Sequence, residues 1–172
     1  MWTDQFTQTQ VDTSHVVDYN HLTLGAFVQN NLEVSEQVSL ESGLRIDHHN
    51  KHGIAYLPRL ALLVKVNPKI ALRFGGGFGY KIPNVFTEET ERVHFRNVLP
   101  VDNEKTNSEK SIGTNLDVNY RTAISDRMTF SFNSLLFYTR INEPVILESN
   151  NAGLYNFQQP EGFIDTKGIE QI

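Results

Sequence analysis

The chain has 172 residues, no cysteine and a formal net charge of -5. The lack of cysteine excludes disulfide scaffolds, cysteine-based zinc sites and thiol catalysis. An acidic balance without a dense cluster of Lys and Arg argues against a nucleic-acid partner. No stretch approaches the roughly 18 apolar residues of a spanning helix, whereas a spanning β-strand needs only about 9 to 11 residues with every second one apolar.

The first 14 residues form a polar lead without the basic and apolar regions of a signal peptide. We therefore expect the chain to be a mature portion or a piece of a longer protein if that protein is exported. After this lead, apolar and other residues alternate with the period of a β-strand, in which successive side chains point to opposite faces. The alternation predicts strands at about 21–31, 38–47, 54–66, 70–80, 112–122 and 128–141, with a partial strand after residue 162.

The pattern is clearest between residues 60 and 80. Leu60, Leu62 and Val64 share one predicted face, and the intervening residues share the other. The polar break at 67–69 separates this run from a second alternating run. Two alternating runs around so short a break predict a β-hairpin with one apolar face.

The breaks between predicted strands alternate in length. Those at 31–37, 67–69 and 123–127 are short, whereas the series at 47–53, 81–110 and 142–162 includes the long ones. In an antiparallel meander, successive connections lie at opposite ends of the sheet, so one end carries tight turns and the other carries long loops. This asymmetry is typical of outer-membrane barrels. A soluble sandwich also has one apolar face, but strands of about ten residues exceed the usual 5 to 6 and favour a bilayer.

The segment LGAFVQNNLEVSEQVSLESGLRID is similar to a Gly-aromatic-x-Gln strand that is followed by a Gly-Leu-Arg strand. The hairpin LPRLALLVKVNPKIALRFGGGFGYKIPN comes next, and the strands EKSIGTNLDVNY, FNSLLFYTRINEPV and GFIDTKGIE follow it in order. Between about residues 20 and 170, these segments together resemble the β-barrel of TonB-dependent outer-membrane receptors.

This resemblance implies an all-β fold, an antiparallel meander of about six to seven long strands that is a section of a transmembrane β-barrel. The whole range 1–172 would be one partial barrel domain, with a polar lead at 1–14 and long loops at 81–110 and 142–162. The family's plug domain and aromatic-terminated last strand have no counterpart here, so we expect a fragment. The alternatives are a small self-contained β-barrel binding module, soluble or of the eight-stranded membrane type, and a fragment that folds as a soluble unit.

The resemblance also implies a function. The parent protein would be an active importer in the bacterial outer membrane, not an enzyme, and it would take up a scarce nutrient such as a siderophore-iron complex, cobalamin, a metal or a glycan. Its expected partners are outer-membrane lipid, the plug domain of the same parent chain and, through the missing N-terminal part, a TonB-type energy-transducing complex. We expect no cofactor and no nucleic-acid partner.

Four arginines fall on the predicted polar face together with acidic residues. They either pair with these carboxylates in a lattice of ion pairs or contribute to the path of an anionic substrate. These candidates for substrate binding are Arg45, Arg59, Arg73 and Arg121.

Three histidines lie close together in the polar segment 47–53. His48, His49 and His52, beside a carboxylate, offer ligands for zinc, copper or nickel, and the alternative is a solvated loop. The segment GGGFG at 75–79 lacks the Gly-Lys-Ser/Thr ending of a phosphate loop, so we interpret it as a strand whose bare face allows close approach by a neighbour. No arrangement of nucleophile and base stands out, which argues against catalysis.

Overall fold

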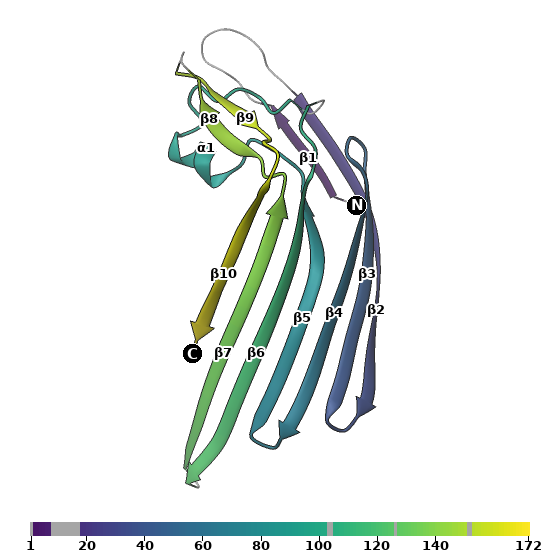
Figure 1. The fold of residues 1–172 in the computed structure, drawn as a ribbon. Coiled ribbons are helices and arrows are strands. Elements are labelled where there is room, and N and C mark those ends of the chain that lie inside the picture. The colour runs from purple at the N-terminus through teal and green to yellow at the C-terminus, as the bar shows by residue number, and fades with distance from the viewer. Residues whose placement is uncertain (1, 8–17, 103–104, 126, 151–152) are drawn as a thin grey trace.

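The chain forms a curved antiparallel sheet with loops above one of its ends (Figure 1). The computed structural model describes residues 2–7, 18–102, 105–125, 127–150 and 153–172. Among these residues, eight strands form the sheet in the order β1-β2-β3-β4-β5-β6-β7-β10. Their bounds are β1 Trp2–Thr7, β2 Asp18–Ser35, β3 Val38–His49, β4 Gly53–Asn67, β5 Ile70–Lys81, β6 Glu109–Ser125, β7 Met128–Asn142 and β10 Phe163–Gln171.

Tight turns join the strands at one end of the sheet, and the long loops lie at the other end. We call the end with the tight turns the turn end. In the turn between β4 and β5, the Oδ1 atom of Asn67 accepts hydrogen bonds from the backbone N–H groups of Lys69 at 2.8 Å and Ile70 at 2.9 Å. Between β2 and β3, Ser35 Oγ accepts from the N–H of Val38 at 3.1 Å. Asn and Ser favour turns because their side chains satisfy nearby backbone donors. The predicted short break at 67–69 is confirmed, whereas the one predicted at 31–37 is shorter, because β2 continues to Ser35 and β3 begins at Val38.

One face of the sheet, the apolar face, carries a continuous row of apolar side chains. The strand pairing places one residue from each of seven neighbouring strands side by side, from β2 to β7 and on to β10. This row is Leu32, Leu40, Leu62, Phe74, Leu116, Leu136 and Ile169. Because the side-chain period of a strand is 2, the shared register keeps the odd-numbered residues of β3 to β6, including the four predicted arginines, on the opposite, polar face.

The sheet does not enclose a core of its own. Among the described residues, the buried hydrophobic side chains are Val85, Val98 and Val101, and all three lie in the loop between β5 and β6. In contrast, Leu62's neighbour in the row, Phe74, is 53% exposed. No helix in the described part of the chain is long and apolar enough to span a membrane.

The strands β4 and β5 pair over only part of their length. Their ladder runs from Asn67 and Ile70 to Arg59 and Gly77, and it ends there, although β4 stays paired with β3 and β5 stays paired with β6 farther up. The next residue of β4 is Pro58, which has no N–H to donate to a neighbouring strand. The upper parts of β4 and β5 therefore separate, and this separation shapes the candidate site described below.

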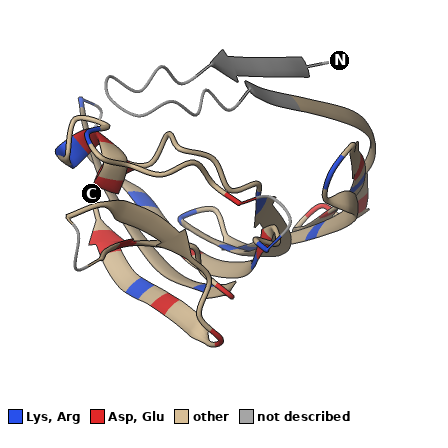
Figure 2. Cartoon of the chain, turned by 90° about the horizontal axis from the view of Figure 1, so that it is seen from above, with Lys and Arg blue, Asp and Glu red and all other residues tan. Residues whose placement is uncertain are grey.

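The structure adds strands to those that the sequence predicts. All seven predicted strands are present, and they extend beyond their predicted ends. Within the polar lead, β1 is a strand that was not predicted, and it pairs with β2. Residues 8–14 of the lead lie outside the described residues. Among the described residues, no pairing connects β1 with β10, so the sheet is open. The sheet is therefore not a closed barrel of eight strands, and in Figure 2 it curves like part of a barrel wall.

Candidate functional site

The two long loops carry secondary structure of their own. They lie at the end of the sheet opposite the turn end, and we call this end the loop end. The loop between β5 and β6 contains α1, Glu88–Arg92, and the loop between β7 and β10 contains β8, Ile146–Ser149, paired with β9, Tyr155–Gln158. A parallel bridge between Val98 and Tyr155 connects the two loops. Phe157 of β9 packs against the small core of Val85 and Val101, so apolar burial holds the loops together.

The short helix α1 begins with a reciprocal cap. The Oγ1 atom of Thr87 accepts from the N–H of Thr90 at 3.3 Å, and Oγ1 of Thr90 accepts from the N–H of Thr87 at 3.0 Å. The buried hydroxyl of Thr90 also donates to the carbonyl of Val85 at 2.6 Å. These bonds satisfy backbone groups that a helix terminus leaves open and fix α1 to the small core.

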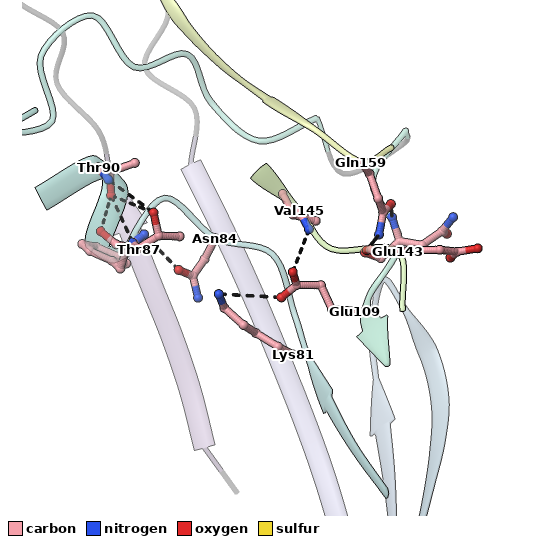
Figure 3. A network of polar contacts seen from close by, with 10 residues as sticks. Lys81, Asn84, Thr87, Thr90, Glu109, Glu143, Val145 and Gln159 are labelled. Carbon is pink, nitrogen blue, oxygen red and sulfur yellow. Dashed lines mark hydrogen bonds and ion pairs between the residues drawn. The ribbon is translucent and has the colours of Figure 1, made fainter. Parts of the chain in front are cut away.

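Two polar side chains attach the loops to the strand ends (Figure 3). The nearly buried carboxylate of Glu109 accepts from the N–H of Val145 at 2.7 Å and pairs with Lys81 Nζ at 3.7 Å. Gln159 joins the two loops: its amide donates to the carbonyls of Asn107 at 3.1 Å and Glu143 at 2.8 Å, and its Oε1 accepts from the N–H of Asn107 at 2.8 Å. The loops are therefore held as one assembly above the sheet.

A buried carboxylate lies on the polar face near the loop end. Asp47 is 1% exposed, and it accepts hydrogen bonds from Arg45 Nε at 2.8 Å and from the hydroxyl of Tyr80 at 2.9 Å. Asp47 lies opposite Gly25 on β2, where a Cβ atom would collide with its Oδ1. On β4 the opposite residue is the small Ala55. Gly25 thus leaves room for the carboxylate, and the hydroxyl of Tyr80 reaches it from β5.

The structure divides the predicted histidine cluster. His48 is exposed and pairs with Ile54, and because it precedes His49 on a strand, its side chain points to the opposite face. His49 and His52 lie together, with ring centroids 5.0 Å apart, and His21 of β2 joins them at 5.0 Å from His49 and 6.3 Å from His52. Within the described residues, no group of three His, Cys, Asp or Glu side chains is arranged to hold a metal ion.

The protonation pattern of His49 follows from its contacts. Its Nδ1 atom accepts from the backbone N–H groups of Lys51 and His52, each at 3.1 Å. A neutral imidazole that accepts at Nδ1 carries its proton at Nε2. His49 is 2% exposed, and its Nε2 is buried with no hydrogen-bond partner among the described residues. His49 thus presents a buried donor, whereas a metal requires an unprotonated nitrogen.

The four predicted arginines share the polar face, but the structure distributes them along the height of the sheet. Arg45 bonds to Asp47, and the exposed Arg59 lies 3.4 Å from Glu41 Oε1. Arg59 and Arg73 line the same groove of about 300 Å³. Arg121 lies near the turn end, where its N–H donates to the carbonyl of Lys69 at 2.8 Å. Of the two roles predicted for these arginines, ion pairing with carboxylates therefore describes Arg45 and Arg59.

The glycines of β5 are covered by side chains of the neighbouring strand. A Cβ atom at Gly75 would lie 2.6 Å from Asn115 Oδ1, and one at Gly79 would lie 2.7 Å from Ser111 Oγ. At these two positions the space that a Cβ atom would take is therefore filled by side chains of β6, whereas the approach of a backbone or ligand from outside the sheet stays a prediction.

Two cavities lie where β4 and β5 separate. A cavity of about 740 Å³ on the polar side is lined by Asp47 and Tyr80. The second, which we call the wall cleft, has a volume of about 760 Å³ and extends between the strands toward the loop that precedes β6. Its lining includes His49, Lys51, His52, Tyr56, Phe78 and Lys110. The wall cleft was not predicted from the sequence. The feature that indicates it is a single residue, Pro58, at which the pairing between β4 and β5 ends.

Comparisons with known proteins agree with this geometry. The family model described as TonB dependent receptor-like, beta-barrel matches residues 2–170. Over 61 residues the chain is 34% identical to the probable TonB-dependent siderophore receptor PirA of Acinetobacter baumannii, a match that covers 36% of this chain and 8% of that protein.

Solved structures share the fold. The siderophore receptor PirA from Pseudomonas aeruginosa superposes with a TM-score of 0.72 at 16% identity, over 90% of this chain and 28% of that one. The FrpB iron transporter from Neisseria meningitidis gives a TM-score of 0.64 at 14% identity, over 90% of this chain and 23% of that one. The chain thus spans about a quarter of the length of these solved relatives.

Proposed function

Because the chain belongs to the TonB-dependent receptor β-barrel family, we propose that it forms part of the barrel wall of an outer-membrane importer whose cargo is a ferric siderophore. The family is one of transport receptors and not of enzymes. The curated relative is named as a siderophore receptor, which supports this cargo over the other nutrients considered from the sequence.

The row of apolar residues across seven strands is the observation that carries this proposal. A soluble sheet buries such a row in a core, whereas here the row is largely exposed and the small core lies in the loops. A barrel wall with its apolar face toward lipid and its polar face toward the lumen accounts for this distribution. The loop end would then be extracellular and the turn end periplasmic.

We assign roles to parts of the chain on this basis. The loops at 81–110 and 142–162 would help to capture cargo outside the cell. Arg73 and Arg121, on the lumenal face, would favour the passage of an anionic chelate, and Arg45 and Arg59 would do so less because their ion pairs with Asp47 and Glu41 offset their charge. The plug domain of the parent protein and a TonB-type complex would complete the machinery.

Uptake of radioactive iron tests this proposal. The full-length receptor that contains this chain is expressed in a bacterial strain without siderophore receptors of its own, and ferric siderophores are compared with cobalamin. We expect iron uptake that requires a working TonB complex and decreases in the Arg73→Ala variant but not in the Arg127→Ala variant, whose exposed arginine lies in the tight turn between β6 and β7. Uptake of cobalamin alone, or uptake without TonB, would contradict the proposal.

A further inference from the structure

The wall cleft combines hydrogen-bond donors with apolar side chains. Its lining includes the buried His49 and two lysines, Lys51 and Lys110. None of the ion pairs found among the described residues involves either lysine. Glu143 also lines the cleft, so two cationic groups face one anionic group there. The cleft is therefore suited to a ligand group that is anionic and accepts hydrogen bonds.

His49 adds a donor that no part of the described chain satisfies. Its Nε2–H is directed by the two backbone bonds to Nδ1, and the side chain is buried. Nε2 of His52 is also buried without a partner among the described residues. A buried polar group without a hydrogen bond costs roughly 1 to 3 kcal/mol, so a ligand oxygen that accepts from His49 would remove this cost.

The cleft also has apolar side chains on the face that we assign to lipid, where the even-numbered Lys110 of β6 lies as well. Ile54, Tyr56 and Phe78 line it, and they are 56%, 64% and 54% exposed. A small anion would make no favourable contact with these apolar side chains. An amphipathic lipid would place its acyl chains along them and its head group among the donors.

We propose that the wall cleft binds the phosphate head group of a lipid of the outer leaflet, with Lys51, Lys110 and His49 as its donors. The inference rests on the membrane orientation proposed above but not on the identity of the cargo. Its ligand would enter from the bilayer through the space between β4 and β5, and not from the lumen.

Retention of lipid by the purified receptor tests this inference. The full-length receptor is placed in nanodiscs of phosphatidylcholine that contain a minor fraction of phosphatidic acid, then extracted with mild detergent, and the bound lipid is counted by native mass spectrometry. We expect selective retention of phosphatidic acid. In the Lys51→Ala/Lys110→Ala variant, retention should decrease at least on the order of tenfold, because a hydrogen bond to a charged group contributes roughly 1.5 to 3 kcal/mol.

The matched control replaces two lysines outside the cleft. The Lys69→Ala/Lys105→Ala variant changes the net charge equally, at the turn between β4 and β5 and in the loop before β6, and it should retain the lipid. His49→Phe keeps a ring of similar size without the donor and should weaken retention, with heat-modifiable gel mobility as the check that the barrel has folded. Because the readout is bound lipid, failed iron uptake would not affect the result.

Three outcomes would overturn the inference. The first is equal retention by the cleft variant and its control. The second is binding of inorganic phosphate alone, in detergent, with the same affinity and the same dependence on Lys51 and Lys110 as phosphatidic acid. The third is binding of zinc that requires His49 and His52 and displaces the lipid, since a nitrogen that ligates a metal cannot donate to phosphate.

Discussion

Gly25 determines where the Asp47 carboxylate can lie. A Cβ atom at position 25 would collide with Asp47 Oδ1, and this carboxylate is held from its other sides by Arg45 and Tyr80. We expect Gly25→Ala to destabilise the folded receptor by about 2 kcal/mol, because the carboxylate must move and lose hydrogen bonds while it stays buried. The urea midpoint of the receptor in detergent micelles measures this loss.

Gly43 provides the matched control for Gly25. It lies on the same face of the adjacent strand β3, and a Cβ atom there would be 3.6 Å from its nearest neighbour, the carbonyl oxygen of Val28. Gly43→Ala should therefore be neutral or stabilising by about 0.5 kcal/mol, since alanine loses less backbone entropy than glycine. Equal effects of the two substitutions would show that Asp47 has no fixed position.

His52 gives the loop end a pH dependence. Burial, and then the nearby His21, lower the pKa of His52 below its ordinary value of 6.5. The unfolded chain therefore binds a proton at this residue at a pH where the folded chain does not, so stability is complete above about pH 6.5 and decreases as the pH falls through the folded pKa. We expect His52→Gln to reduce this decrease in urea midpoints measured between pH 7.5 and pH 5, values chosen to bracket roughly the ordinary pKa of histidine.

Asn107→Ala is the control for the histidine experiment. Asn107 lines the same cleft, but its hydrogen bonds to Gln159 use its backbone N–H and carbonyl, so the substitution changes a neutral side chain and keeps these contacts. Its pH profile should match that of the unmodified receptor. If His52→Gln leaves the profile unchanged as well, the destabilisation at low pH arises elsewhere.

At the scale of the elements, one glutamine connects the two long loops. Gln159 makes three hydrogen bonds that join Asn107 and Glu143. We expect Gln159→Ala to lower the free energy of local opening of both loops by about 1 to 2 kcal/mol, because backbone groups at the loop end lose their partners. Hydrogen exchange at the amide of Asn107 measures this directly. Gln158→Ala, at the exposed end of β9, should leave that exchange rate unchanged.

The long strands could be predicted from the sequence because their side-chain period follows directly from strand geometry. Leu62 and Phe74 fall on the predicted apolar face, and the turn at Asn67 lies where the polar break predicts it. The loop elements were not predicted, since their small core joins Val85 of one loop to Phe157 of the other, and no local pattern records a contact between residues so far apart in the chain. The metal hypothesis could not anticipate that alternation along β3 separates His48 from His49.

At the scale of the whole molecule, the distribution of buried surface assigns different environments to different parts. The loops enclose the few buried apolar side chains, whereas the apolar face of the sheet needs another covering. Water does not favour such a surface, since exposed apolar area costs about 25 cal/mol for each Å². Lipid covers it in the proposed barrel, whose wall would continue beyond the edges of this sheet at β1 and β10.

Leu116 lies in the apolar row, between Phe74 on β5 and Leu136 on β7. If this row faces the middle of the bilayer, Leu116→Arg should destabilise the receptor by about 2 to 4 kcal/mol, because a charge there must leave water. Folding of the urea-denatured receptor into lipid vesicles, followed by gel mobility without heating, measures the difference.

Asn119 is the control on the same strand, because it lies three residues farther along β6 and points to the polar face. Asn119→Arg places the same charge in the proposed lumen, where water and neighbouring polar groups solvate it, and it should change stability by less than about 1 kcal/mol. A large cost at position 119 with none at position 116 would reverse the assignment of the two faces. Equal small costs would mean that neither face contacts lipid, and the wall cleft would then have no access to a lipid head group.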